Sequence, residues 1–288
     1  MNMVSIMAWV GVFVSAVAAG ADPQNPSPMV EHTRVHPRLK EEHPEGRREK
    51  LAAGTLFIPA SLAKETEMPL LIFMHGGSWI PEVAAVKRGM AALTIQRSDG
   101  YRPMFEKDGA FEAMISEASE KGGLHWSRIT VGGWSAGCQG IRQIMRSPSA
   151  LKMVGSVLMI DGIHTSYVEG KPGPLESKID TEALKPIADF AREAIAGRKP
   201  LLITHSEIFP GTFASTTETS DWLLRELDVG RRAILEWGPM KTQMLSDARK
   251  GAFRLVGFAG NSAPDHVDQL DALPELLDWL DAQDAKHP

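Results

Sequence analysis

A serine between two glycines is the first feature of this sequence that could do chemistry. Residues 128–139 read RITVGGWSAGCQ, and within them Gly133-Trp134-Ser135-Ala136-Gly137 follows an apolar segment and precedes a helical pattern that Pro148 ends. A serine on a sharp turn from strand to helix presents its hydroxyl as a nucleophile, and the glycines allow the backbone to pack closely around it. The motif predicts acyl transfer at Ser135, with the N–H of Ala136 at the helix N-terminus donating to a developing oxyanion.

A second glycine turn occurs upstream, in PLLIFMHGGSW. His75, Gly76 and Gly77 come directly after an apolar segment. A loop in this position can supply the other N–H group of an oxyanion hole. Because strand, HGG and serine turn occur in the expected order, Gly76 and Gly77 are predicted oxyanion-hole residues rather than only a strand-end turn.

The elements that must position these turns are short apolar strands that alternate with helices. Strands are expected at 54–58, 70–74, 129–133, 155–160, 201–204 and 254–258. Several are nearly continuous in apolar residues, which is typical of parallel strands covered on both faces. Helices are expected at 181–196, 217–229 and 267–282. The pattern predicts an α/β fold with a mostly parallel central sheet flanked by helices, in a single domain.

The N-terminus carries features of export. The apolar run 6–20 ends in small residues and is too short for a membrane span, so residues 1–21 are predicted to be a secretory signal peptide, although no Lys or Arg precedes the run. Residues 22–50 are expected to be a charged, flexible lead-in, and 51–288 the folded domain. This interpretation predicts a secreted or periplasmic protein without stable membrane insertion after signal cleavage, and an N-terminal segment kept as a membrane anchor stays open as the alternative.

Composition excludes several other classes of protein. The 288 residues carry a formal charge of −5, which gives no reason to expect a nucleic-acid surface. A single cysteine, Cys138, excludes an intrachain disulfide and a zinc site built on several thiolates. Loosely spaced histidines at 32, 36 and 43 are interpreted as surface residues rather than metal ligands. The oligomeric state is not indicated by the sequence.

The motifs HGGSW at 75–79 and GWSAG at 133–137, together with a late histidine, resemble the α/β-hydrolase superfamily in its secreted esterase, feruloyl esterase and depolymerase branches. The resemblance spans residue 54 to the C-terminus. It implies a serine ester hydrolase with no metal or organic cofactor and with a triad in the chain order Ser, acid, His. His266, which follows the last strand and is expected just before the closing helix, matches the position of the base in this family.

Two carboxylates compete for the role of the acid. Members of the superfamily usually take it from the region where this chain has Glu207, and some take it from the preceding strand, which here ends in Asp161. A carboxylate that closes so apolar a strand needs a charged or hydrogen-bonding partner, and an imidazole is one. Asp161 is favoured and Glu207 stays open, whereas Asp265 and Asp268 flank His266 too closely to orient its ring.

The expected function is hydrolysis of carboxylic esters through an acyl-enzyme, on acylated carbohydrate or on similar small or polymeric esters. An insertion near 162–199 is placed where this fold grows lids and substrate-binding loops. Two alternatives stay open: a serine peptidase, and a non-catalytic scaffold that binds a partner.

Overall fold

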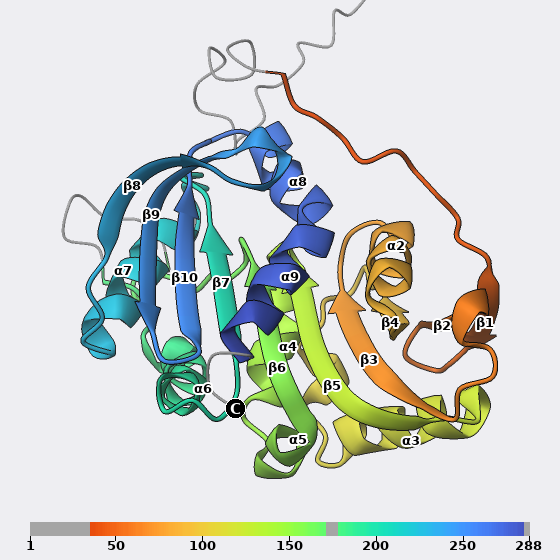
Figure 1. Cartoon of the computed structure of the whole chain (residues 1–288). Helices are drawn as coiled ribbons and strands as arrows, with labels where there is room; N and C mark the ends of the chain where they lie inside the picture. Colours follow the sequence, from red (N-terminus) through yellow and green to blue (C-terminus); the bar gives the residue numbers. More distant parts are fainter. Residues whose placement is uncertain (1–34, 171–177, 285–288) are drawn as a thin grey trace, which may run out of the picture.

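A ten-stranded sheet organises the computed structural model, which describes residues 35–170 and 178–284 (Figure 1). The order across the sheet is β1-β2-β4-β3-β5-β6-β7-β10-β9-β8. The strands that run parallel to their neighbours form its centre: β4 (Ala91–Ile95), β3 (Glu67–Met74), β5 (His125–Trp134), β6 (Val154–Ile160), β7 (Leu201–His205) and β10 (Phe253–Phe258). The predicted fold class, a mostly parallel sheet flanked by helices, is confirmed.

Antiparallel strands complete both sides of the sheet. They are β1 (Gly46–Lys50) and β2 (Thr55–Pro59) on one side, and β9 (Gln243–Lys250) and β8 (Arg232–Trp237) on the other. The sequence did not indicate β1, β8, β9 or the central strand β4. Most of β1 and β8 is solvent-exposed, so these strands lack the apolar run that marks a buried strand. The sequence of β4, AALTI, is equally compatible with a helix by its composition.

Helices cover the two faces of the sheet. One face is packed by α2 (Trp79–Arg88), α8 (Ala263–Asp271) and α9 (Leu273–Asp284), and α9 crosses in front of the central strands in Figure 1. The other face is packed by α3 (Ala110–Gly122), α4 (Cys138–Ile144), α5 (Pro148–Met153), α6 (Lys185–Ile195) and α7 (Thr216–Glu226). The two resulting apolar clusters bury the strands on both faces of the sheet. This packing fixes the positions of the ends of the parallel strands relative to one another. No helix in the described ranges is long and apolar enough to cross a bilayer.

Two sequence expectations need correction. The lead-in 22–50 is not flexible throughout, because Gly46–Lys50 forms β1 and pairs with β2; the predicted signal peptide at 1–21 lies outside the described residues. The closing helix begins earlier than residue 267. Ser262 caps α8, accepting a hydrogen bond from the N–H of Asp265, while the Asp265 carboxylate accepts one from the N–H of Ser262. His266 therefore lies in the first turn of α8 and not before it.

Candidate active site

The register of the parallel strands brings the predicted site residues to one edge of the sheet. Aligned residues form a row across five strands: Met74, Gly133, Met159, Ile203 and Leu255. Two positions beyond this row, β3, β5 and β6 are followed by Gly76, Ser135 and Asp161 respectively. Because the carboxyl ends of parallel strands lie at the same edge, residues far apart in the chain come together there.

The turn that holds Ser135 is tightly packed and strained. Ser135 begins a short 3-10 turn (Ser135–Gly137) and has a φ of 51°, a left-handed conformation that is uncommon for a serine. A Cβ on Gly137 would lie 2.1 Å from the carbonyl oxygen of Met74, and one on Gly162 would lie 2.3 Å from that of Ser135. Glycine is therefore required where neighbouring strand ends meet the turn. Strain of this kind is concentrated at functional sites.

Asp161 and His266 form the central polar contact of the site. The Nδ1 of His266 lies 2.7 Å from the Oδ2 of Asp161, across 105 positions of sequence. The carboxylate of Asp161 is buried, and its other oxygen accepts hydrogen bonds from the N–H of Ser206 (2.9 Å) and the hydroxyl of Thr216 (2.8 Å). Ser206 and Thr216 have no recognisable motif in the sequence, so only the fold identifies them as supports of the aspartate.

The charge state of Asp161 follows from these partners. Burial alone would raise the pKa of the carboxyl. The charge of His266 and the hydrogen bonds from His266 and Ser206 outweigh burial and hold the pKa of Asp161 below its ordinary value. Asp161 is therefore an ionised acceptor near neutral pH and can fix the tautomer of His266 that carries its proton on Nδ1.

Trp134 joins the serine turn to His266. Its ring lies 4.4 Å from the ring of His266, centroid to centroid, and its Nε1–H donates to the His266 carbonyl oxygen at 3.0 Å. On the other side, His75 stacks on Trp134 with centroids 5.1 Å apart. Burial, and then repulsion from His266, lower the pKa of His75. The side chain before Ser135 thus contacts and positions the α8 histidine, which the motif alone did not reveal.

The serine turn is linked to His266 through Trp134 and not through a bond from Ser135 itself. Among the described residues, no hydrogen bond joins the Ser135 hydroxyl to the imidazole of His266. Catalytic hydrogen bonds are often long before substrate binds and shorten in the substrate complex. A very small cavity of about 10 Å³, lined in part by Asp161, Thr216 and His266, lies beside the histidine, and this volume is about that of one water molecule.

A larger cavity of about 500 Å³ opens beside Ser135. The serine turn and α4 contribute Ser135, Ala136, Gln139 and Arg142 to its wall. The predicted insertion contributes five further residues to the lining: His164, Thr165, Ser166, Asp180 and Ala183. His164 and Phe213 line this cavity and also the small one beside His266. Residues of the segment 162–199 therefore border this cavity, and residues 171–177 of that segment lie outside the described chain.

Lowering the pH is expected to destabilise the folded protein through His164. Burial lowers the pKa of His164 to about 4 from an ordinary value of 6.5. Between these two pKa values the imidazole binds a proton in the unfolded chain but not in the folded chain. The stabilising contribution of the neutral imidazole is therefore fully present above pH 6.5 and is lost as the pH falls toward 4. The free energy of unfolding in urea should fall between pH 7.5 and pH 5.0, and this fall should be about 2 kcal/mol larger in the wild type than in His164→Asn.

The matched control for this measurement is His125→Asn, which changes an exposed histidine at the start of β5. This variant should keep the pH dependence of the wild type. An equal pH dependence of unfolding in His164→Asn and the wild type would contradict the assignment of a neutral, half-buried imidazole to His164.

The other candidate residues are placed as follows. Glu207 has an exposed side chain, and its backbone N–H donates to the carbonyl oxygen of Gly260. Gly76 has a φ of 98°, and a Cβ there would meet the side chain of Leu270 in α8, so the HGG loop packs directly on the helix that carries His266. Ala136 lies within the 3-10 turn and lines the large cavity. The structure brings Asp161, and not Glu207, to His266.

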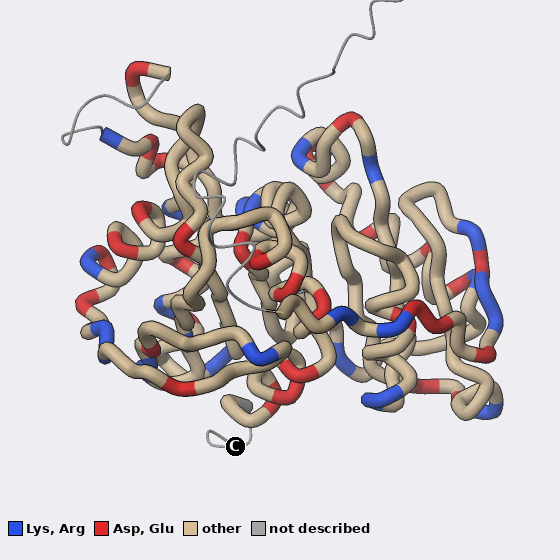
Figure 2. Tube along the Cα trace, turned by 90° about the horizontal axis from the view of Figure 1, so that it is seen from above, with Lys and Arg blue, Asp and Glu red and all other residues tan. Residues whose placement is uncertain are grey.

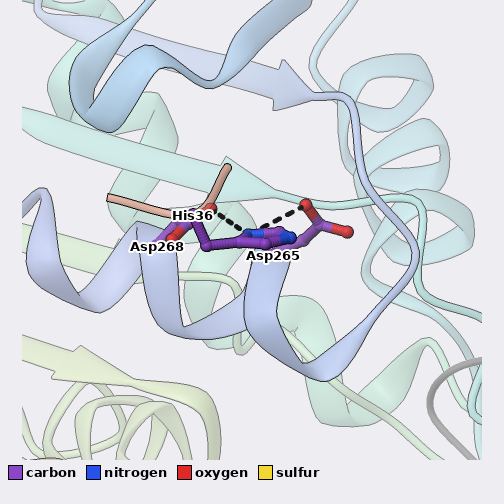
Figure 3. A group of neighbouring side chains, drawn as sticks. All are labelled: His36, Asp265 and Asp268. Atoms are coloured by element: carbon purple, nitrogen blue, oxygen red, sulfur yellow. Dashed lines mark hydrogen bonds and ion pairs between the residues drawn. The ribbon is translucent and has the colours of Figure 1, made fainter. Parts of the chain in front are cut away.

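One group of described side chains has the composition of a metal site: His36, Asp265 and Asp268, shown in Figure 3. Its atoms are already used in ion pairs and hydrogen bonds. The Nδ1 of His36 lies 2.8 Å from Asp268, and Arg38 also pairs with Asp268. Asp265 accepts a hydrogen bond from the hydroxyl of Ser262 in the cap of α8. We interpret the group as a clamp that fastens residues 36–38 to α8. His36 is therefore largely buried, not a surface residue.

Comparison with known proteins gives structural similarities at low identity. No protein-family model matches the sequence, and no curated protein matches it. A fungal esterase from Rhizomucor miehei is 12% identical, with 85% of this chain and 86% of that chain covered and a TM-score of 0.48. An α/β hydrolase from the metagenome of Lake Arreo, Spain, is 14% identical, with 86% and 82% covered and a TM-score of 0.46.

A peptidase is also among the similar structures. The acylaminoacyl peptidase of Pyrococcus horikoshii is 16% identical, with 83% of this chain and 42% of that chain covered and a TM-score of 0.45. This chain thus spans about two fifths of the peptidase. At such identities the similarities concern architecture, and function has to follow from the side chains of this chain.

Proposed function

We propose that this protein is a serine ester hydrolase of the α/β-hydrolase type, with Ser135 as nucleophile, His266 as base and Asp161 as the acid of the triad. The observation that carries the proposal is the 2.7 Å contact between His266 Nδ1 and the buried carboxylate of Asp161, at the strand edge that also holds the strained Ser135 turn. A histidine oriented by a carboxylate beside a serine is the arrangement that activates a hydroxyl for acyl transfer.

The reaction follows from this arrangement in two steps. The Ser135 oxygen attacks the ester carbonyl while the Nε2 of His266 takes the hydroxyl proton, and the tetrahedral intermediate collapses as the imidazolium returns that proton to the leaving alcohol. Water, deprotonated by the same nitrogen, then hydrolyses the acyl-enzyme and releases the carboxylic acid. Asp161 stays ionised throughout and stabilises the imidazolium.

Backbone N–H groups of Ala136 and of the Gly76–Gly77 loop are the proposed donors to the oxyanion. Their positions follow from the register, since the HGG loop continues the strand beside the one that ends in the serine turn. One such donor stabilises the transition state by about 3 kcal/mol in serine hydrolases. Export of the protein, and an acylated carbohydrate or similar ester as its substrate, belong to the same proposal and rest on the sequence.

The test of this function combines covalent labelling with turnover. A fluorophosphonate probe should attach once per chain, and digestion followed by mass spectrometry should place the adduct on Ser135. The protein should also hydrolyse p-nitrophenyl acetate and leave the p-nitroanilide of an acetylated amino acid intact. Absence of both labelling and ester turnover would overturn the proposal in favour of a binding scaffold, whereas cleavage of the anilide at a comparable rate would favour a peptidase.

A further inference from the structure

Arginine side chains line the cavity beside the nucleophile. Ser135, Gln139 and Arg142 are spaced at i, i+4 and i+7, so they follow one another along one side of the turn and of α4, and all three border the 500 Å³ cavity. Arg102, which precedes α3 in the chain, reaches the same cavity at its rim, where its side chain is 68% exposed. Two arginine side chains thus border the cavity beside Ser135.

Arg142 forms no ion pair among the described residues, although the charge of Asp180 acts on it across the cavity. One of its terminal nitrogens donates to the backbone oxygen of His164 at 2.9 Å, and no carboxylate of the described residues lies within ion-pair distance of it. Burial, followed by repulsion from Arg146 and Arg102, lowers the pKa of Arg142. A half-buried arginine in a positive surrounding is stabilised when an anion binds to it.

The remaining polar groups of the wall offset part of this charge, but none of them forms an ion pair with Arg142. Asp180 also borders the cavity, where its Oδ1 accepts a hydrogen bond from the N–H of Ala183, and it offsets one positive charge. Arg102 is paired with Glu106 outside the cavity wall. His164 contributes a buried Nδ1 that has no partner among the described residues. Elsewhere, basic and acidic positions are interspersed along the chain (Figure 2), so the arginines form a local and not a general positive surface.

We propose that this cavity selects esters that carry a carboxylate at some distance from the bond that is cleaved, with Arg142 as the main contact and Arg102 as an outer one. The proposal rests on ester hydrolysis at Ser135. Arg142 lies seven positions after Ser135, which corresponds to about 10 Å at the rise of an α-helix, and an arginine side chain leans back toward the helix N-terminus. The spacing therefore fits a spacer of several methylene groups or one aromatic ring. The planar guanidinium suits a carboxylate, which it can bind through two hydrogen bonds.

The experiment compares acids with their own methyl esters. On the acyl side the pair is mono-4-nitrophenyl adipate and its methyl ester, and on the alcohol side it is 4-acetoxybenzoate and its methyl ester. In at least one pair, the wild type should show a kcat/KM for the acid that is about ten times that for the neutral ester or more, as expected for a hydrogen bond to a charged group. Arg142→Gln should lower this ratio about tenfold, and Arg142→Lys should retain part of it.

The matched control is Arg146→Gln, which removes the same charge from an exposed position one turn further on, outside the cavity. Its ratio should stay within about twofold of the wild-type value. A ratio near one in both pairs for the wild type, or a ratio that Arg142→Gln leaves unchanged, would overturn the proposal. Should Arg142→Gln fail to fold, Arg102→Gln provides the same comparison with a smaller expected loss.

A binding measurement separates this proposal from the proposed function. Calorimetry should show that monomethyl adipate binds to the Ser135→Ala variant. Its affinity for the double variant Ser135→Ala/Arg142→Gln should be at least several times lower. If no ester is hydrolysed by the wild type but this difference is found, the esterase assignment fails and the anion site stands. If esters are hydrolysed at Ser135 and neither selectivity nor binding depends on Arg142, the anion site fails and the esterase assignment stands.

Discussion

Replacing Ser135 with alanine is expected to reduce kcat for p-nitrophenyl acetate by about 10⁵-fold or more. The hydroxyl oxygen is the atom that bonds to the acyl group, so its removal leaves only the binding and electrostatic contributions of the cavity. His266→Ala should cause a loss of similar size, because Asp161 then has no imidazole to orient. The double variant should be hardly less active than either single one, since the side chains act as a unit.

The control for the serine is Ser149→Ala, which makes the same chemical change at an exposed position in α5 and should retain wild-type turnover. Turnover of Ser135→Ala above about one per cent of the wild type would show that another group attacks the ester. Losses of Ser135→Ala and His266→Ala that simply multiply in the double variant would show that the two side chains act independently, contrary to the triad.

The positions of the two glycine-containing turns of the site could be predicted because each turn is formed by residues that are adjacent in the sequence. The strand–GWSAG–helix order placed Ser135 correctly at the end of β5, and HGG correctly at the end of β3. These turns depend on glycines that make close backbone contacts, and such requirements leave a clear trace in a sequence. The central parallel strands were equally readable, except for β4, because burial on both faces demands continuous apolar runs.

The contacts that connect these segments could not be predicted in the same way. The hydrogen bond between Asp161 and His266 spans 105 positions, and the donors from Ser206 and Thr216 come from a third and a fourth segment. Asp161 and His266 could be favoured from their places after apolar strands, but Ser206 and Thr216 carry no sequence pattern, and only the fold brings them to the aspartate. The exposed strands β1 and β8 escaped detection for a related reason: pairing at the edge holds them in place, and burial does not.

Asp161→Asn is expected to lower kcat about 10⁴-fold with little change in KM, because an amide neither stabilises the imidazolium nor keeps the proton of His266 on Nδ1. Glu207→Gln, the same chemical change at the competing carboxylate, is expected to retain activity, since that side chain is exposed and His266 is already bonded to Asp161. Both variants should be assayed with p-nitrophenyl acetate, after circular dichroism has verified their folding.

The pair of variants decides between the two carboxylates because the substitutions remove equal charge from one sheet edge. If His266 responded only to the negative charge of its surroundings, both substitutions would lower the activity. The two losses would then be of similar size, because the energy of a charge interaction falls off slowly with distance. A specific role in orienting the imidazole requires contact, and only Asp161 has it, with Oδ1 held by Ser206 and Thr216 so that Oδ2 faces Nδ1. Thr216→Val should therefore lower kcat while leaving KM unaltered, and a large loss in Glu207→Gln with an active Asp161→Asn would reverse the assignment.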